Sequence, residues 1–263
     1  MSTVLDEIIG GVREDLEDRR AKHPLEKVQE LALSTAPALD AVCALRGDGQ
    51  TVRIISEVKR SSPSKGILGE IADPAELAVK YQRGGAAISV LTEERRFGGS
   101  LEDLDAVRAH VSIPILRKDF IVDEYQIWEA RAHGADLVLL IVAALEEDTL
   151  SAFLELAESL GMNALVEAHT SEEISIAQRV GAKIIGINVR NLKTLEVKNA
   201  HYAELASDLP ESVIKVAESG VSGLSDVQNY AQAGADVVLI GETLVKSGDP
   251  EKTVREFSAV PHL

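Results

Sequence analysis

The sequence predicts an α/β fold in which eight parallel strands and eight helices alternate to form a closed (β/α)8 barrel, preceded by a helical extension. Short, nearly continuous apolar runs recur eight times along the 263 residues. Segments with helical spacing separate these runs, and a glycine often stands between the end of a helix and the next run. Strands that are apolar on both faces are typical of parallel sheets covered on both sides, and eight βα units suffice to close a barrel.

The N-terminal segment, residues 1–50, precedes the first apolar run. Its apolar residues recur at helical spacing, which predicts one or more added helices. They are Val4, Leu5, Ile8, Ile9 and Val12. Because so short a segment cannot build a core of its own, we expect it to cap an end of the barrel. Residues 51–263 then form the barrel, and the whole chain is a single domain.

The barrel elements follow in order along the chain. The runs predicted as strands are 53–58, 84–91, 113–119, 134–142, 161–167, 181–188, 213–219 and 234–241. The segments predicted as helices are 74–83, 100–110, 123–133, 146–160, 171–180, 200–207, 222–233 and 249–258. The first of these helices has Asp73 as its expected N-cap and Pro74 in its first turn. An open doubly wound sheet is the alternative, but no G-x-G-x-x-G motif follows the first run.

The composition restricts the possible partners and compartment. The formal net charge is −16, which disfavours nucleic acid and anionic membranes, so we expect neither as a partner. The single cysteine, Cys43, excludes an intramolecular disulfide and is expected to be a small core residue on a helix. No signal-peptide pattern stands at the N-terminus, and the longest apolar run, 137–145, is too short to span a bilayer. We expect a cytoplasmic protein, and we expect it to be a monomer.

Polar side chains follow most of the predicted strands, at the barrel end where such folds place their chemistry. These residues are Glu57, Lys59, Ser61 and Ser62; Thr92 and Glu93; Arg117, Lys118 and Asp119; Glu167; Asn188 and Arg190; Glu218 and Ser219; and Glu242. Glu57 and Lys59 lie two residues apart, so an extended chain points both in the same direction. Lysines among carboxylates in a partly desolvated barrel mouth are suited to proton transfer near neutral pH.

The loops after the seventh and eighth strands have the glycines that allow an anion to approach the backbone. We expect a phosphate site there, built by Ser219, Gly220 and Gly241, with Ser62 reaching it from the first loop. The six histidines show no metal-ligand spacing, and His169 is the only plausible ligand among them. No metal site and no Ser-His-Asp nucleophile arrangement is therefore predicted.

Seven motifs, in order between about residues 50 and 247, resemble the indole-3-glycerol phosphate synthase family of tryptophan biosynthesis. They are SEVKRSSPSKG, PILRKDFIVDEYQI, LLIVAAL, LVEAHT, GINVRNL with TLEV just after, VAESGVSG and VVLIGETLV. The resemblance implies a (β/α)8 TIM barrel and a cofactor-free carboxy-lyase. Its substrate would be 1-(2-carboxyphenylamino)-1-deoxyribulose 5-phosphate, whose pyrrole ring closes with loss of carbon dioxide and water.

The resemblance also implies roles for individual residues. Lys118 would be the general acid, Lys59 would hold the substrate carboxylate and assist dehydration, and Glu167 would be the base or would stabilise the cationic intermediate. Glu57 and Asn188 would orient and polarise the reacting groups. How Lys59, Glu57 and Glu167 divide the acid and base roles is left open.

The remaining implied residues bind the substrate. They are Arg190 for the carboxylate, Phe97, Phe120 and Leu139 for the aromatic ring, and Ser62, Ser219, Gly220, Gly241 and Glu242 for the phosphate. Glu242 stands where members of the family often have serine. Because a carboxylate beside a phosphate is unfavourable, we expect only its backbone N–H to face the ligand.

Two alternatives have different requirements. A phosphoribosylanthranilate isomerase would need a Cys/Asp acid–base pair at the strand ends, whereas Cys43 precedes the barrel and the first strand offers Glu57 and Lys59. A non-catalytic phosphate-ligand binder would keep the phosphate loops without needing Lys118 or Glu167.

Overall fold

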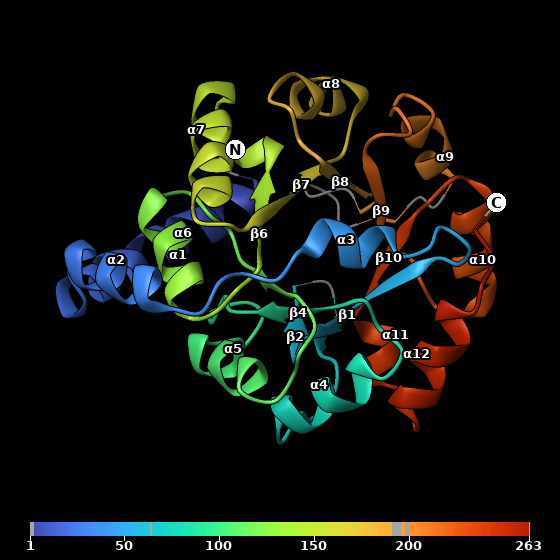
Figure 1. The fold of residues 1–263 in the computed structure, drawn as a ribbon, viewed down its shortest axis with the longest axis horizontal. Coiled ribbons are helices and arrows are strands. Elements are labelled where there is room, and N and C mark those ends of the chain that lie inside the picture. Colours follow the sequence, from blue (N-terminus) through green and yellow to red (C-terminus); the bar gives the residue numbers. More distant parts are fainter. Residues whose placement is uncertain (1–2, 64, 191–195, 198–199, 263) are drawn as a thin grey trace.

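The computed structural model describes residues 3–63, 65–190, 196–197 and 200–262, and its central feature is a closed barrel of parallel strands (Figure 1). The strands are β1 (Arg53–Val58), β4 (Ala87–Leu91), β5 (Ile115–Lys118), β6 (Leu137–Ile141), β7 (Asn163–Ala168), β8 (Ile184–Asn188), β9 (Ile214–Glu218) and β10 (Val237–Ile240). Neighbours along the chain pair in parallel, and β1 closes the ring against β10. All eight predicted strands, and with them the barrel, are confirmed.

Helices surround the barrel and follow the strands as predicted. They are α4 (Pro74–Gln82), α5 (Leu101–Arg108), α6 (Glu124–Ala132), α7 (Glu147–Ser159), α8 (Ser171–Arg179), α9 (His201–Ala206), α10 (Leu224–Gln232) and α12 (Pro250–Ser258). The expected N-cap Asp73 accepts hydrogen bonds from the backbone N–H groups of Ala75 and Glu76. Two short elements were not predicted: a 3-10 turn η1 (Val142–Ala144) after β6 and a helix α11 (Glu242–Val245) after β10.

The loop after β1 contains a small antiparallel pair, β2 (Ser61–Ser62) with β3 (Gly66–Ile67). The sequence predicted a loop here without strands. The pairing joins Ser61 to Ile67 and Ser62 to Gly66, so this loop has a hairpin structure of its own.

Alternation along the strands determines which side chains enter the barrel. Ile55, Leu116, Leu165 and Val216 are buried in one cluster together with other residues of the barrel interior. Side chains two residues further along a strand point in the same direction. The residues that stand two positions after these four are Glu57, Lys118, Glu167 and Glu218. The interior therefore has an apolar floor with a layer of ionisable side chains above it.

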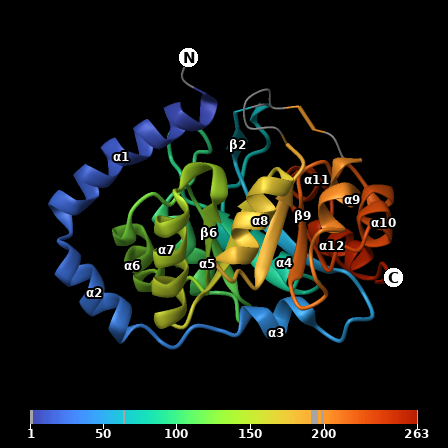
Figure 2. The same cartoon turned by 90° about the horizontal axis from the view of Figure 1, so that it is seen from above.

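The N-terminal extension forms α1 (Val4–Lys22), α2 (Leu25–Ser34) and α3 (Ala41–Arg46), and it reaches both ends of the barrel (Figure 2). Helix α1 begins at the end where β2 lies, and α3 lies at the opposite end. Ala41 and Leu45 of α3 are fully buried and share the apolar cluster of the barrel interior with Ile55. The predicted extension is thus confirmed as helical, and it covers two ends rather than one.

Two further expectations concern the position of Cys43 and the presence of a membrane-spanning helix. Cys43 lies on helix α3 as predicted, but its side chain is exposed, so the expected core position is wrong. The buried positions of this helix are instead Ala41 and Leu45, on its opposite face. No helix in the described part of the chain is long and apolar enough to cross a membrane.

Candidate active site

A pocket opens at the carboxyl ends of the strands, and every site residue predicted from the sequence lines it. These residues are Glu57, Lys59, Ser62, Phe97, Lys118, Phe120, Leu139, Glu167, Asn188, Arg190, Ser219, Gly220, Gly241 and Glu242. Each of the eight barrel strands, or the loop that follows it, contributes at least one of them. Helix α1 adds Val4, Leu5 and Ile8 to the lining. These three residues were predicted to belong to the N-terminal extension but not to the site.

Lys118 lies between two buried carboxylates inside the pocket. Its Nζ is 3.0 Å from Oε2 of Glu167 and 3.2 Å from Oε2 of Glu218. Burial disfavours the ammonium ion, but attraction to the neighbouring carboxylates outweighs burial and raises the pKa of Lys118. Lys118 therefore carries a proton at neutral pH.

The pKa values of the two carboxyl groups beside Lys118 are shifted in opposite directions. Burial, reinforced by the charge of Glu167 and opposed by that of Lys118, raises the pKa of Glu218 to about 8. Burial acts in the same direction on Glu167, but Lys118 and His169 outweigh it and lower the pKa of Glu167. At neutral pH the site thus has one ionised and one protonated carboxyl group around a single ammonium ion, an arrangement able to give and accept protons.

Glu57 and Lys59 form a second ion pair in the pocket. Nζ of Lys59 lies 2.5 Å from Oε2 of Glu57, whose other oxygen accepts a hydrogen bond of 3.5 Å from the hydroxyl of Ser89. Gly241 makes room for this pair, because a Cβ atom at that position would lie 2.4 Å from Oε2 of Glu57. The glycine predicted for anion binding is therefore also required by the packing of the lysine–glutamate pair.

The turn after β9 has an unusual backbone. Ser219 has φ 73°, the only positive φ of a non-glycine residue in the described part of the chain, and Gly220 follows with φ 76°. The hydroxyl of Ser219 donates to Oδ1 of Asn188 at 2.9 Å, and Tyr230 OH donates to the carbonyl of Ser219 at 3.0 Å. Such conformations persist where the surroundings hold them, and they cluster at ligand sites.

Glu242, at the start of α11, is paired with two lysines. Its Oε1 lies 2.8 Å from Nζ of Lys65 in the first loop and 2.8 Å from Nζ of Lys246. Burial acts against ionisation, but the two lysines outweigh it and lower the pKa of Glu242. One carboxylate beside two ammonium groups leaves this end of the pocket with a net positive charge, which offsets the unfavourable glutamate noted in the sequence.

The pocket has an apolar wall opposite these charges. The rings of Phe97 and Phe120 contact each other with centroids 5.9 Å apart and planes tilted by 39°. Leu139 of β6 belongs to the same lining, and Val4, Leu5 and Ile8 of α1 extend it. This wall provides a surface on which a flat aromatic group can bury.

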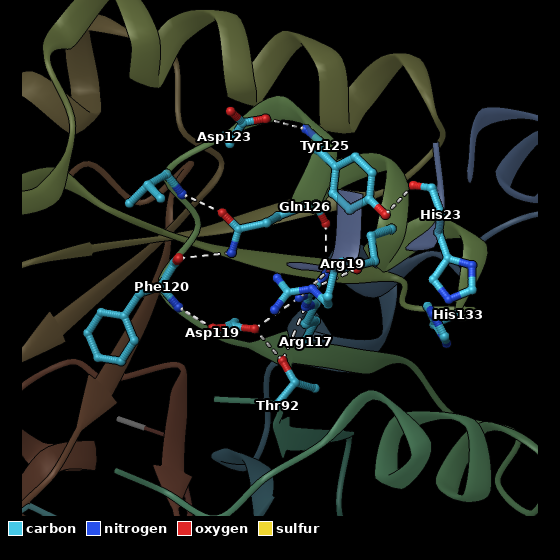
Figure 3. A network of polar contacts seen from close by, with 12 residues as sticks. Arg19, His23, Thr92, Arg117, Asp119, Phe120, Asp123, Tyr125, Gln126 and His133 are labelled. Atoms are coloured by element: carbon cyan, nitrogen blue, oxygen red, sulfur yellow. Dashed lines mark hydrogen bonds and ion pairs between the residues drawn. The ribbon is translucent and has the colours of Figure 1, made fainter. Parts of the chain in front are cut away.

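Behind Lys118, on the outer face of β5, Arg117 is the centre of a buried polar network (Figure 3). Its guanidinium donates to Oδ2 of Asp119 at 2.9 Å, to Oγ1 of Thr92 at 3.2 Å and to the carbonyl of Gln126 at 2.9 Å. It also lies 2.9 Å from Oε2 of Glu129. The network therefore joins the strand that carries the central lysine to β4 and α6.

The chain is similar to known proteins over nearly its whole length. The model of the family described as indole-3-glycerol phosphate synthase matches residues 5–257. The chain belongs to the indole-3-glycerol phosphate synthase family. A relative of that name from Micrococcus luteus is 62% identical over 261 residues, covering 98% of this chain and 97% of the relative. Indole-3-glycerol phosphate synthase 1 of Streptomyces coelicolor is 60% identical over 258 residues, covering 98% and 95%.

Solved structures extend the likeness of fold beyond the family. The 3-hexulose-6-phosphate synthase of Salmonella typhimurium superposes with a TM-score of 0.64 at 16% identity, covering 80% of this chain and 98% of that one. At this identity the similarity concerns the barrel alone. It confirms the fold predicted from the alternating apolar runs.

Two polar residues of this indole-3-glycerol phosphate synthase family member were not among the predicted site residues. Glu218 was noted at the end of its strand without a role, although it stands two residues after Val216 and so points inward like Glu167. His169 was considered only as a metal ligand, and in the structure it lies between Glu167 and Glu173. Among the motifs, parts of SEVKRSSPSKG, GINVRNL and TLEV lie outside the described residues.

Gly186 of β8 offers a test of the position of Glu218. A Cβ atom there would lie 2.1 Å from Oε1 of Glu218, so alanine would push this carboxyl group away from Lys118. We expect Gly186→Ala to lower kcat of the family reaction by about 10-fold to 10²-fold, since misplacing a catalytic group by about 1 Å has effects of that size. The control is Gly248→Ala, where no atom lies within 4 Å of the new Cβ. Equal kcat for both variants would contradict the prediction.

Proposed function

We propose that this chain is a carboxy-lyase that converts 1-(2-carboxyphenylamino)-1-deoxyribulose 5-phosphate into indole-3-glycerol phosphate, carbon dioxide and water. The observation that carries the proposal is the protonated Lys118 held between Glu167 and Glu218. This group stands in one pocket with an apolar wall and with the turn at Ser219 and Gly220. Membership of the family supports the same reaction.

The first chemical step requires proton delivery to oxygen. The ring carbon that bears the carboxylate attacks the ketone carbon, a carbon–carbon bond forms, and the carbonyl oxygen takes a proton from Lys118. Positive charge then develops on the anilino nitrogen and ring, and the ionised Glu167 stabilises it. Glu218, protonated at neutral pH, can return a proton to Lys118.

The later steps remove carbon dioxide and water. Loss of carbon dioxide restores the aromatic ring, so the electrons of the broken bond need no cofactor as a sink. Lys59, paired with Glu57, then protonates the departing hydroxyl, and a carboxylate accepts the proton lost from the neighbouring carbon. Asn188 orients the reacting groups from the end of β8.

The rest of the pocket suits the remaining parts of this substrate. The aromatic ring lies against Phe97, Phe120 and Leu139, and Arg190 pairs with the carboxylate. The phosphate lies at the other end, at Ser62, Ser219, Gly220, Gly241 and Glu242. Glu242 is there paired with the ammonium groups of Lys65 and Lys246. The net charge of −16 supports a small-molecule substrate rather than nucleic acid or a membrane surface. Our proposal includes a cytoplasmic, monomeric enzyme.

The experiment is to incubate the purified chain with this substrate and to follow the indole product by its absorbance. Wild-type protein is expected to form product without an added cofactor. Phosphoribosylanthranilate is offered in a second reaction, since turnover of that compound alone would favour the isomerase alternative. Binding of the carboxyphenylamino substrate without turnover would favour a non-catalytic binder and would overturn the proposal.

A further inference from the structure

His169 bridges two carboxylates at the point where β7 passes into α8. Its Nε2 lies 3.3 Å from Oε1 of Glu167, and its Nδ1 lies 3.1 Å from Oε2 of Glu173. The backbone N–H of His169 also donates to Oε2 of Glu173 at 2.6 Å. The carboxylate of Glu173 therefore holds His169 from the α8 side through one contact to its backbone and one to its imidazole, and the other ring nitrogen faces Glu167.

Glu167 consequently has a nitrogen partner on each of its oxygens. Oε2 faces Nζ of Lys118 at 3.0 Å, and Oε1 faces Nε2 of His169. The side chains of Glu173, His169, Glu167 and Lys118 form a line of alternating charge from the first turn of α8 into the pocket. His169 itself is outside the lining of the pocket, so it acts on the reaction through Glu167 rather than on the substrate.

The charged surroundings of His169 are simple. Glu167 on β7 and Glu173 on α8 are the charged groups in contact with the imidazole in the described part of the chain. The turn η1 contacts both β7 and α8 and consists of Val142, Ala143 and Ala144, which do not titrate. Beyond Glu167, the next charged groups are Lys118 on β5 and Glu218 on β9.

We infer that His169, anchored by Glu173, is a positioning residue that directs the carboxylate of Glu167 toward Lys118 and gives this carboxylate a second cationic partner. The inference rests on the proposed function, in which Glu167 acts as an ionised group. A carboxylate with partners on both oxygens loses its freedom to rotate, and a cation on each side favours its ionised form.

The protonation of His169 agrees with this geometry. Burial disfavours the imidazolium ion, but the contacts with Glu167 and Glu173 outweigh burial and raise the pKa of His169 to about 10. The imidazole is thus charged throughout the neutral range, in contrast to an ordinary histidine with a pKa of about 6.5. Its charge is lost only in alkaline solution.

The test compares His169→Gln with wild type over the pH range of activity. Glutamine keeps a polar side chain at this position but has no charge, so the pKa of Glu167 should rise in the variant. We expect the acid limb of the kcat profile to move to higher pH by about one unit, because an opposite charge at this distance shifts a carboxyl pKa by one unit or more. KM should stay unchanged, and kcat at its optimum should fall by about 10-fold.

Two further variants sharpen the comparison. Glu173→Gln should move the acid limb in the same direction, since it removes the anchor of the imidazole. His201→Gln is the matched control, because His201 forms an exposed pair with Glu204 at 3.0 Å at the start of α9. An acid limb and kcat that stay at wild-type values in His169→Gln, even with a lowered melting temperature, would overturn the inference and leave His169 a purely structural residue.

A second measurement separates this inference from the proposed function. The imidazole of His169 is titrated by NMR in the wild type and in Glu167→Gln. We expect a midpoint well above pH 8 in the wild type and a lower one in the variant. A wild-type midpoint near 6.5 would overturn the inference even if the enzyme turns over its substrate. Absence of product from the wild type, with the expected titration, would overturn the proposed function alone.

Discussion

Lys118→Ala is expected to lower kcat for indole formation by a factor on the order of 10² or more, with little change in the fold. The side chain is the only cation between Glu167 and Glu218 in the described part of the pocket, at 3.0 and 3.2 Å. Its removal takes away the acid that protonates the carbonyl oxygen. It also leaves two carboxyl groups facing each other, so Glu167 loses the ion pair that favours its ionised form.

The measurement is the initial rate of indole formation at saturating substrate, beside a melting curve for each variant. The matched control is Lys183→Ala, because Lys183 forms an ordinary exposed pair with Glu158 at 2.8 Å. It should keep the wild-type kcat. Near-full activity of Lys118→Ala would show that another group is the acid, and binding of substrate without turnover in the wild type would point to a phosphate-ligand binder.

The barrel could be predicted because each of its strands is encoded locally. The run LVLLI is apolar at every position, which marks a strand buried on both faces, and it forms β6. RIISEV carries two consecutive isoleucines and forms β1, where every residue after Arg53 is buried. The positions of Glu57, Lys118 and Glu167 followed from the same pattern, since each stands at the end of such a run. Sequence order and alternation were therefore enough to bring these side chains into one pocket.

Features that depend on long-range packing were outside the reach of the sequence. Of the two lysines that balance Glu242, Lys246 stands only four residues later, but Lys65 comes from the first loop, and its pairing with Glu242 spans 177 positions. Helical spacing identified the extension, but not that α1 would line the pocket while α3 buries Leu45 at the far end. The exposure of Cys43 could not be predicted for the same reason. Which face of a short helix becomes buried depends on the distant segments against which the helix packs.

Glu218 was missed for a different reason. Its strand, IKVAE, carries Lys215 as well as Glu218, so charge alone did not separate an inward position from an outward one. The two lie three residues apart and therefore on opposite faces of the strand. Glu218 shares its face with Val216 and Ile214, both of which belong to the barrel interior, and this parity is the signal that could have identified it.

Arg117→Met is expected to lower the free energy of unfolding by about 3–5 kcal/mol, the cost of removing one partner from a buried ion pair. The side chain of Arg117 is 1% exposed and faces Asp119 and Glu129, each 5% exposed. Methionine fills much of the volume of the arginine side chain. Both carboxylates then remain buried without the positive charge that the guanidinium supplied. Within the described residues, Glu129 keeps Arg19 of α1 as an ion-pair partner at 3.0 Å, whereas Asp119 keeps hydrogen bonds from Thr92 and the backbone of Phe120 but no cation.

Chemical denaturation at neutral pH measures this change, and Arg179→Met is the control. Arg179 pairs with Glu147 at 2.6 Å on the surface, where a lost pair costs about 0–1 kcal/mol. The variant Arg117→Met with Asp119→Asn should recover part of the stability, because the second substitution removes one of the stranded charges. If Arg117→Met unfolds at the same denaturant concentration as Arg179→Met, the network contributes no more than a surface pair. Strand β5, which carries both Arg117 and Lys118, is then held in place without a contribution from this network.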